Sequence, residues 1–427
     1  MTDAPTRLLG RADQGAVRRA NLAVVVRALR SSPRTRAQLT ADTLLTKATV
    51  SSLVGELSTR GLVRSHEPTK AGLVGRPGQQ VELIGERVLA VGLELNVDYL
   101  AAVVLDLTGE RRAKARTALD VSASVEDTVD AAADLIARVT AQAETAGNVL
   151  AGVGVAAPGL VDAASGQVRV APNLGWRDVA LRDLLRRRLP RTRVMVDNEA
   201  NLATLAEYAA VQDVAATDRD LIYLTGGIGI GGGIVVNGEV VRGSAGYAGE
   251  VGHLAVAPAP DGERCGCGRR GCLETVCGLG ALLRLAADEA DPVHDHGRDL
   301  DERLDLLMSR ATAGDPRTLR AFAQIGRALG HGASMLVNLV NPRVLVLGGY
   351  FARVGEFLRE PVEAELAERV VAPDLGGCRI TLSRLGLAAA ATGAAHSALQ
   401  PVLDDPTLVP ALSPRHGAHA TLEKEIG

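Results

Sequence analysis

Hydrophobic residues within the first 85 positions recur at intervals of three and four, which is the spacing of amphipathic helices. This pattern predicts a helix over residues 16–29, which ends before Pro33 because the residue ahead of a proline avoids helical backbone angles. Thr35 can cap a short second helix, and Thr46 can cap a third over residues 47–59. The third helix has one apolar face, formed by Val50, Leu53, Val54 and Leu57.

After the third helix the pattern changes to two short strands around a polar, basic loop. The segment G-L-V-R-S-H-E-P comes before the loop G-R-P-G, and Q-Q-V-E-L-I follows it. Three helices followed by such a hairpin predict a winged helix-turn-helix over residues 1–85. The turn between the second and third helices reads T-L-L-T, without the glycine that is usual there, so its conformation stays open.

From residue 87 the pattern is that of an α/β domain. Three strands are predicted over residues 87–96, 99–107 and 111–119, followed by an amphipathic helix over residues 124–146 and a further strand. The later stretch D-L-I-Y-L-T-G-G-I-G-I-G-G-G-I-V-V-N-G-E-V-V repeats the order of strand, glycine turn and strand. Two halves that open alike predict an internally duplicated α/β fold with a ligand cleft between two lobes.

Length and composition indicate a globular protein of more than one domain. The chain has 427 residues, of which 47% are hydrophobic. No apolar run approaches the ~20 residues of a membrane-spanning helix, and the N-terminal M-T-D-A-P-T-R lacks the apolar region of a secretory signal. We therefore expect a cytoplasmic protein without a membrane partner. The predicted divisions are 1–85, 86–400 and a proline-containing, disordered tail over 401–427.

Charge is distributed unevenly along the chain. Residues 1–85 hold 13 Lys and Arg against 6 Asp and Glu, whereas the whole chain has a net charge of -3. A basic front module on an acidic body favours a polyanionic partner for the front module alone. Aromatic residues make up only 2% of the chain, which leaves few platforms for stacking the bases of a single strand. Double-stranded DNA is therefore the expected partner.

The polar face of the third helix is the predicted DNA-reading surface. Small polar residues and a lysine at the start of a helix suit insertion into a major groove, and this face carries Lys47, Thr49, Ser51 and Ser52. Arg76, directly before Pro77 in the loop, is placed to enter a minor groove. The alternative is a small helical packing domain, which three short helices also fit.

A short, glycine-rich segment over residues 249–274 gathers one histidine and three of the five cysteines. The spacing of its His253, Cys265, Cys267 and Cys272 is typical of one tetrahedral zinc site. Four protein ligands leave no open position for an activated water, so the predicted zinc is structural. Ordinary cysteines in a glycine loop are the alternative, which a Cys-Gly-Cys-Gly run beside two arginines does not favour.

A zinc at this position would also fix the two ends of its loop. Glu250 lies three residues before His253, and Glu274 lies two residues after Cys272. We expect both carboxylates to point into one cavity, with the second ring nitrogen of His253 free to contact a ligand.

Several of these motifs together resemble the ROK family of sugar kinases and sugar-responsive repressors, within the actin-like, ribonuclease H-like sugar-kinase superfamily. They are G-E-V-G-H followed by C-G-C-G-R-R-G-C-L-E, together with T-G-G-I-G-I-G-G-G-I and A-A-P-G-L-V-D, and the resemblance covers residues 86–398. A winged helix in front of this domain is similar to the regulator branch. The resemblance implies a two-lobed domain, and a homodimer or homotetramer that binds a double-stranded operator with paired half-sites.

The resemblance also implies a set of sugar-binding residues. The family's hydroxyl-binding positions match Asn173, Asn198, Glu199, Glu250, His253 and Glu274. Carboxylates and amides suit a polyol because they share paired hydrogen bonds with neighbouring hydroxyls. The expected effector is a sugar or a sugar phosphate. For each residue alone, a solvated turn or a satisfied core position is the alternative.

Two positions argue against kinase activity. Active members of the family carry an Asp, two glycines and a Thr at the first hairpin, where this chain reads E-L-N-V-D from Glu94 to Asp98, and Asp98 would put a carboxylate in the place of a phosphate. Their catalytic base is the Asp of an N-D-A-N string, which reads N-E-A-N here with Glu199 in the place of that Asp. Phosphoryl transfer depends on positioning, so we predict that catalysis is lost.

The sequence therefore predicts a sugar-responsive DNA-binding regulator, most simply a repressor of carbohydrate-metabolism genes. The alternative is an ATP-dependent sugar kinase with an appended DNA-binding domain. Residues 225–233 keep a glycine pattern that could bind phosphate, which a tight β-turn also explains.

Overall fold

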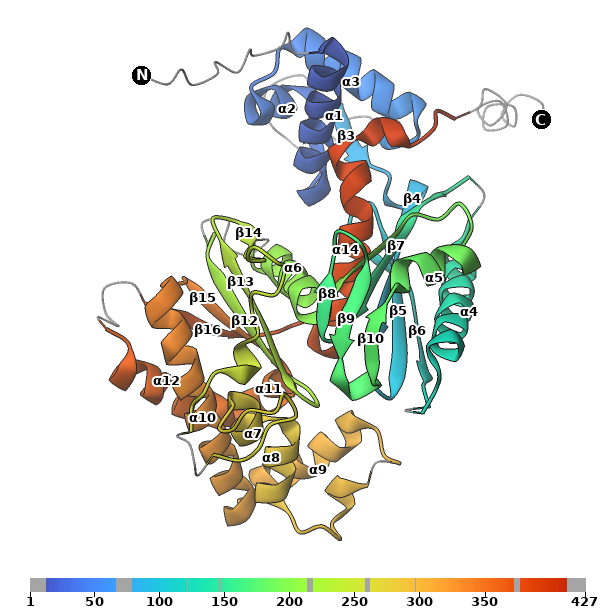
Figure 1. Cartoon of the computed structure of the whole chain (residues 1–427). Coiled ribbons are helices and arrows are strands. Elements are labelled where there is room, and N and C mark those ends of the chain that lie inside the picture. Colours follow the sequence, from blue (N-terminus) through green and yellow to red (C-terminus); the bar gives the residue numbers. More distant parts are fainter. Residues whose placement is uncertain are drawn as a thin grey trace, which may run out of the picture.

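The computed structural model describes most of the chain and has the expected order of a small front module and a two-lobed body (Figure 1). The described residues are 13–66, 79–120, 122–145, 147–212, 218–257, 262–295, 297–371 and 377–412. None of the helices in these ranges combines the length and the apolar character that a bilayer span requires.

The front module consists of three helices and a three-stranded sheet of order β1-β3-β2, the arrangement of a winged helix-turn-helix. Its elements are α1 (Gln14–Ser31), β1 (Arg34–Thr35), α2 (Arg36–Thr43), α3 (Lys47–Thr59), β2 (Val63–His66) and β3 (Gln80–Leu83). The three helices predicted from the hydrophobic pattern are present, and the apolar face of α3 is buried. The loop between β2 and β3 lies outside the described residues.

The caps and the turn of the helix-turn-helix follow from local chemistry. Thr35 and Gln38 form a capping box at the start of α2, and the Thr46 hydroxyl accepts from the backbone N–H of Thr49 at 3.2 Å. The turn that the sequence left open places Leu44 in the left-handed region, with φ of 59° and a side chain that is 90% exposed. At the C-cap of α2 a leucine thus takes the left-handed conformation for which glycine is usual, and its side chain extends into solvent.

The first lobe is built on a five-stranded sheet of order β11-β7-β4-β5-β6. Helices α4 (Val125–Ala143) and α5 (Leu181–Arg188) cover one of its faces. The opposite face is covered by α14 (Ala389–Asp404), with α6 (Glu199–Gln212) beyond it. The strands of the lobe, including a small separate sheet of β8, β9 and β10, are β4 (Val88–Leu95), β5 (Tyr99–Asp106), β6 (Arg111–Ala118), β7 (Val149–Ala157), β8 (Leu160–Asp162), β9 (Gln167–Ala171), β10 (Trp176–Val179) and β11 (Val194–Asn198).

The second lobe repeats this plan with a sheet of order β14-β13-β12-β15-β16. In both lobes the first strand of a hairpin is central, pairs antiparallel with the second strand and pairs parallel with a later strand. This repetition confirms the duplication expected from the sequence. The elements are β12 (Leu221–Gly226), β13 (Ile230–Val236), β14 (Glu239–Val240), β15 (Val344–Gly349), β16 (Arg379–Leu382), α7 (Leu273–Cys277), α8 (Leu279–Ala286), α9 (Leu300–Thr312), α10 (Pro316–Val340), α11 (Tyr350–Arg353) and α12 (Gly355–Arg369).

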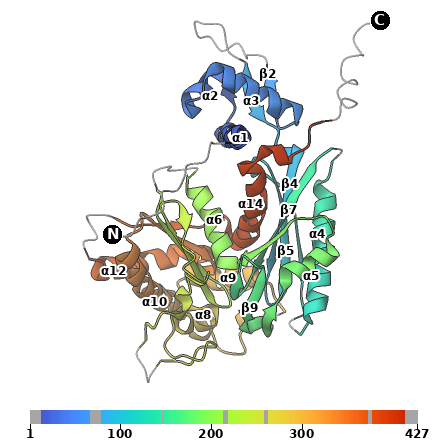
Figure 2. The same cartoon turned by 45° about the horizontal axis from the view of Figure 1, so that its top comes forward.

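Helix α14 returns from the second lobe to the first and lies unusually close to its neighbours (Figure 2). A Cβ atom on Gly92 of β4 would lie 1.9 Å from the backbone oxygen of Ala391. A Cβ on Gly393 of α14 would lie 1.8 Å from the backbone oxygen of Leu202 in α6. Only glycine permits these approaches, so α14 is wedged between the first sheet and α6.

The prediction of a disordered tail is wrong for residues 401–412. Helix α14 continues through Pro401 to Asp404, and a 3₁₀ helix, η6 (Pro406–Leu408), follows it. Val402 and Leu403 are buried, and Val409 is fully buried, in a hydrophobic cluster that also contains residues of α1 and α3. Pro401 therefore lies inside a helix and Pro406 begins a 3₁₀ helix. These segments are ordered because the apolar residues beside the prolines pack on the front module. Residues 413–427 lie outside the described residues.

Candidate functional site

A cavity of about 280 Å³ lies between the two lobes and contains the predicted ligand-binding residues. Its wall is formed by the end of β4, the start of α6, the turn between β12 and β13, parts of the segment 249–274 and the start of α14. All six residues expected to bind a ligand line it: Asn173, Asn198, Glu199, Glu250, His253 and Glu274. The structure thus brings together side chains that are about 100 positions apart in the sequence.

The two ring nitrogens of His253 face different groups. Nδ1 lies 3.7 Å from Cys265 Sγ, while Nε2 lies 3.9 Å from Glu250 Oε2 on the cavity wall. The residue lies at the end of the 3₁₀ helix η3 (Val251–His253), whose backbone fixes the ring between the thiols and the cavity. One nitrogen can therefore face a metal while the other faces the cavity.

The four predicted metal ligands are gathered at one point. The side-chain ligand atoms of His253, Cys265, Cys267 and Cys272 all lie within 4.8 Å of one another. The Sγ atoms of Cys267 and Cys272 are 3.7 Å apart. A tetrahedron with Zn–S bonds of about 2.3 Å has an edge of about 3.8 Å, so the quartet has the dimensions of one tetrahedral site.

Glu274 connects this quartet to the glycine turn of the second lobe. Its Oε1 lies 3.5 Å from Cys265 Sγ, and its Oε2 accepts from the backbone N–H of Ile230 at 3.1 Å. A Cβ on Gly229 would lie 2.4 Å from the same Oε2, so the glycine makes room for this contact. The carboxylate of Glu274 thus holds the β12–β13 turn at the cavity wall.

Glu94 is a buried carboxyl that the sequence reasoning did not assign to the cavity. Its side chain is only 6% exposed, its Oε1 accepts from the Tyr99 hydroxyl at 2.7 Å, and its Oε2 has no partner among the described residues. Burial raises the pKa of Glu94 above its ordinary value. The hypothesis for Asp98 is wrong, because Asp98 is exposed and does not line the cavity. The sequence signal that could have identified Glu94 is a single carboxyl within the otherwise apolar run of residues 88–95.

Asn198 orients Glu199 at the start of α6. Its Nδ2 donates to Glu199 Oε2 at 2.7 Å and to the backbone oxygen of Gly159 at 2.9 Å. Its Oδ1 accepts from the backbone N–H groups of Ala200 and Asn201, as a helix cap does. Every hydrogen-bonding position of Asn198 is thus engaged within the protein, so Glu199 is the more available of the two.

Glu199 is held in its neutral form at pH 7. Burial, reinforced by the nearby carboxylates of Glu250, Glu94 and Asp197, raises the pKa of Glu199 from 4.5 to about 8. A protonated carboxyl can donate one hydrogen bond and accept others, which suits a sugar hydroxyl. The same protonation makes Glu199 a poor acceptor of a proton from a substrate near neutral pH.

This pKa shift predicts a pH dependence of stability. Glu199 stays protonated in the folded state where it ionises in the unfolded state, so the free energy of unfolding should fall as pH rises from 4.5 to about 8. Between about pH 5 and pH 8 we expect the free energy of unfolding of the wild type to fall by on the order of 3 kcal/mol more than that of Glu199→Gln. Urea unfolding at each pH measures this difference. The exposed-site control Glu239→Gln should follow the wild type. Parallel pH profiles for Glu199→Gln and the wild type would contradict the assignment.

The residues expected to contact DNA lie on α3, with one exception. Lys47, Ser51 and Ser52 are exposed, and Ser52 Oγ accepts from Arg18 at 3.3 Å. Thr49 is half-buried, with its hydroxyl 2.9 Å from that of Thr46. Arg76 lies outside the described residues.

The family model for the ROK family matches residues 90–400, which is most of the chain. The chain belongs to the ROK family. It is 32% identical over 361 residues to a putative xylose repressor from Caldicellulosiruptor sp. (strain Rt8B.4), and the match covers 82% of this chain and 88% of that protein.

Solved structures of the ROK family include both regulators and kinases. The chain superimposes with a TM-score of 0.73 on a ROK family transcriptional regulator, a homologue of the E. coli MLC protein, at 24% identity, over 91% of this chain and 97% of that one. It superimposes with a TM-score of 0.62 on a ROK family glucokinase from Streptomyces griseus in complex with glucose and AMPPNP, at 29% identity, over 73% and 99% of the two chains. The match to the regulator covers 91% of this chain, so it includes residues of the front module as well as the body, and the helical front module is consistent with the fold of that regulator.

Proposed function

We propose that this ROK family protein is a sugar-responsive DNA-binding repressor that acts in the cytoplasm and binds its sugar without phosphorylating it. The proposal rests on one observation above all: a carboxylate-rich cavity and a winged helix-turn-helix belong to one packed body. Residues of α1, α3, the first sheet and α14 form one hydrophobic cluster. The similarity to a xylose repressor over most of both chains supports a role in the control of sugar metabolism.

The wall of the cavity favours a neutral sugar over a sugar phosphate. Of the described residues that line it, none is a lysine or an arginine, whereas four are glutamates, Glu94, Glu199, Glu250 and Glu274. A phosphate near buried carboxyls gains no counter-charge and is repelled by those that are ionised. The expected effector is therefore an unmodified pentose or hexose.

Calorimetric titration can test this preference directly. We expect D-xylose or D-glucose to bind, and glucose 6-phosphate to bind at least about tenfold more weakly than the better of the two. The control is Glu239→Gln on an exposed strand, which should leave both affinities unchanged. Equal or tighter binding of the phosphorylated sugar would overturn the proposed ligand class.

The same geometry supports the loss of phosphoryl transfer. Asn96 and Val97 replace the paired glycines of the first hairpin, and the Tyr99 side chain lines the cavity beside Glu94. Glu199 would hold a proton at neutral pH where a catalytic base must accept one. The second candidate function, an ATP-dependent sugar kinase, is favoured by the likeness to a glucokinase, and an assay for ADP formation separates the two.

We further propose that the quartet of His253, Cys265, Cys267 and Cys272 holds a structural zinc ion. The distances among their ligand atoms fit that ion, and a complete set of four ligands assigns it no chemical step. Its contribution would be to fix His253 and Glu274, which form part of the cavity wall.

In the proposed mechanism, a bound sugar changes the relative position of the lobes. Two ion pairs already join them, from Arg242 to Asp197 at 2.6 Å and from Arg116 to Asp299 at 3.1 Å. A homodimer or homotetramer would present paired recognition helices to the two halves of an operator, so lobe motion would alter their spacing. The sugar must bind one arrangement more tightly than the other for this switch to operate.

Operator binding should depend on the exposed start of α3. Replacing Lys47 with alanine is expected to weaken binding about fivefold or more in a mobility-shift assay, because one phosphate or base contact is removed. The probe is a duplex that the wild type selects from a random-sequence library. Lys114→Ala, on the exposed edge of β6, is the matched control. If Lys47→Ala and Lys114→Ala bind the duplex alike, α3 is not the reading helix.

A further inference from the structure

The segment after α14 wraps around the end of the recognition helix. We call residues 405–412 the C-terminal strap. The backbone N–H of Leu412 donates to the Thr59 oxygen at 2.9 Å, and Arg87 donates to the Pro410 oxygen at 3.2 Å. Val409 is fully buried, so the strap is anchored by both apolar and polar contacts.

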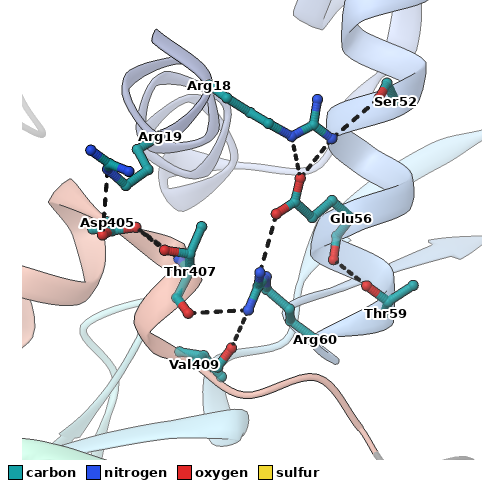
Figure 3. A network of polar contacts seen from close by, with 9 residues as sticks. All are labelled: Arg18, Arg19, Ser52, Glu56, Thr59, Arg60, Asp405, Thr407 and Val409. Atoms are coloured by element: carbon teal, nitrogen blue, oxygen red, sulfur yellow. Dashed lines mark hydrogen bonds and ion pairs between the residues drawn. The ribbon is translucent and has the colours of Figure 1, made fainter. Parts of the chain in front are cut away.

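Arg60, directly after α3, joins the strap to the recognition helix (Figure 3). Its Nη1 donates to the backbone oxygens of Thr407 at 3.1 Å and Val409 at 2.7 Å. Its Nη2 donates to Glu56 Oε1 at 3.2 Å. One guanidinium therefore fixes two strap carbonyls and one side chain of α3, in the planar geometry for which arginine is suited.

Glu56 would be an unfavourable neighbour for DNA phosphates without this contact. It lies on α3 one turn after Ser52, and Arg18 of α1 donates to its Oε2 at 2.7 Å (Figure 3). Although burial opposes the shift, hydrogen bonds from Arg18 and Arg60 hold the pKa of Glu56 below its ordinary value. Two cations thus compensate a carboxylate that could otherwise repel the backbone of a duplex.

The strap is also continuous with the wall of the sugar cavity. Helix α14 begins at Ala389 and Ala390, which line the cavity, and ends at Asp404, which pairs with Arg27 of α1. Along its length it touches β4, whose end carries Glu94, and α6, whose start carries Glu199. Close glycine contacts on both sides leave α14 little room to move independently of those elements.

We propose that Arg60 and the C-terminal strap are positioning elements for the recognition helix, and that α14 makes their position depend on the state of the cavity. This inference rests on the proposed function insofar as it concerns an operator. The positioning of α3 itself does not require DNA and can be measured without it. A change in the wall of the cavity would be carried by a single rigid helix to the end of α3.

Two truncations and two substitutions separate this role from general stability. One chain ends at Asp404 and lacks the strap, whereas its control ends at Leu412 and keeps it. Arg60→Ala removes the contacts to the strap and Glu56, and Arg60→Lys keeps the charge. These four proteins, and the combination of Arg60→Ala with the chain ending at Asp404, are compared with the wild type in three measurements. They are hydrogen exchange of the α3 amides without DNA, the same exchange with whichever of D-xylose and D-glucose binds more tightly in the calorimetric titration, and affinity for the selected duplex.

We expect Arg60→Ala and the chain ending at Asp404 each to raise amide exchange in α3 and to weaken duplex binding roughly tenfold, since contacts to a charged group are lost. Their combination should add little, because both break one set of contacts. Arg60→Lys should recover part of the affinity, and the chain ending at Leu412 should match the wild type. The sugar that binds should change α3 exchange in the wild type and not in Arg60→Ala.

Other results would overturn the inference. Unchanged α3 exchange in Arg60→Ala, or fully additive effects of the substitution and the short truncation, would show that Arg60 does not act through the strap. An equal effect of that bound sugar on α3 exchange in the wild type and in Arg60→Ala, or none in either, would contradict the coupling. If the wild type binds no duplex DNA, the proposed function fails, while the exchange measurements still decide whether the strap positions α3.

Discussion

A protein in which Cys265 and Cys267 are both serine is expected to lose the proposed zinc ion and the proposed response to sugar. Two of the four ligands disappear, and a hydroxyl is a weak substitute for a thiolate. Without the metal, Glu274 loses its fixed position beside the thiols and no longer holds the turn at Ile230. If about 3 kcal/mol of stability is lost, the unfolding midpoint should fall by roughly 3–5 °C, because a larger cooperative unit has a larger entropy of unfolding.

The measurement is thermal unfolding with and without D-xylose, together with the zinc content of the purified protein. The wild type should contain about one zinc per chain and be stabilised by saturating sugar, whereas the double variant should show neither property. Cys378→Ser is the control, since Cys378 is half-buried and lies outside the quartet. A zinc-free double variant that sugar still stabilises would contradict the account of the loop.

Replacing Gly393 with alanine should be the most damaging single substitution considered. The added Cβ would lie 1.8 Å from the backbone oxygen of Leu202, where neither α14 nor α6 can give way easily. We expect a loss of more than about 4 kcal/mol in the free energy of unfolding, or failure to accumulate in soluble form. Expression yield and urea unfolding measure this effect.

Gly55→Ala is the matched control for that substitution. It is also a glycine-to-alanine change within a helix, but a Cβ at this exposed position of α3 would meet nothing within 4 Å. Alanine favours the helix, so the control should gain about 0.5–1 kcal/mol. A Gly393→Ala protein as stable as the wild type would mean that α14 is not held in the tight packing described above.

The sequence predicted those parts of the fold that depend on local patterning. Helix periodicity, threonine caps and alternating strands identified the winged helix and the duplicated sheets, because each of these signals lies within about 20 residues of chain. The turn at Leu44 stayed open because a residue other than glycine adopts the left-handed backbone there, which no local pattern reports.

The parts that could not be predicted depend on contacts between distant segments. The four prolines after residue 400 suggested a disordered tail, yet Val402, Leu403 and Val409 pack against the front module. Similarly, Arg60 has no motif of its own, and its two carbonyl partners lie more than 340 positions away. Such contacts depend on the path of α14 across the first sheet, which the sequence does not specify locally.

The candidate site was partly predictable for the same reason. The His253 and cysteine spacing identified a metal quartet because the ligands lie within one loop. The residues expected to bind sugar line one cavity. They were predicted from the resemblance to a family, because no local spacing connects them. Asp98 was expected to stand in the place of a phosphate, whereas Glu94 was given no role. A carboxyl within a fully buried strand looks like part of a core until its unpaired oxygen is seen.

The central claim is that a sugar controls DNA binding without being phosphorylated. The most direct measurement titrates the selected duplex with the wild type in the presence of Mg-ATP, with and without D-xylose or D-glucose, and records ADP formation in the same samples. We expect one sugar to change duplex affinity at least about fivefold while ADP formation stays at its sugar-free level. Sugar-dependent ADP formation at a rate near 1 s⁻¹ or above, with unchanged duplex affinity, would contradict it.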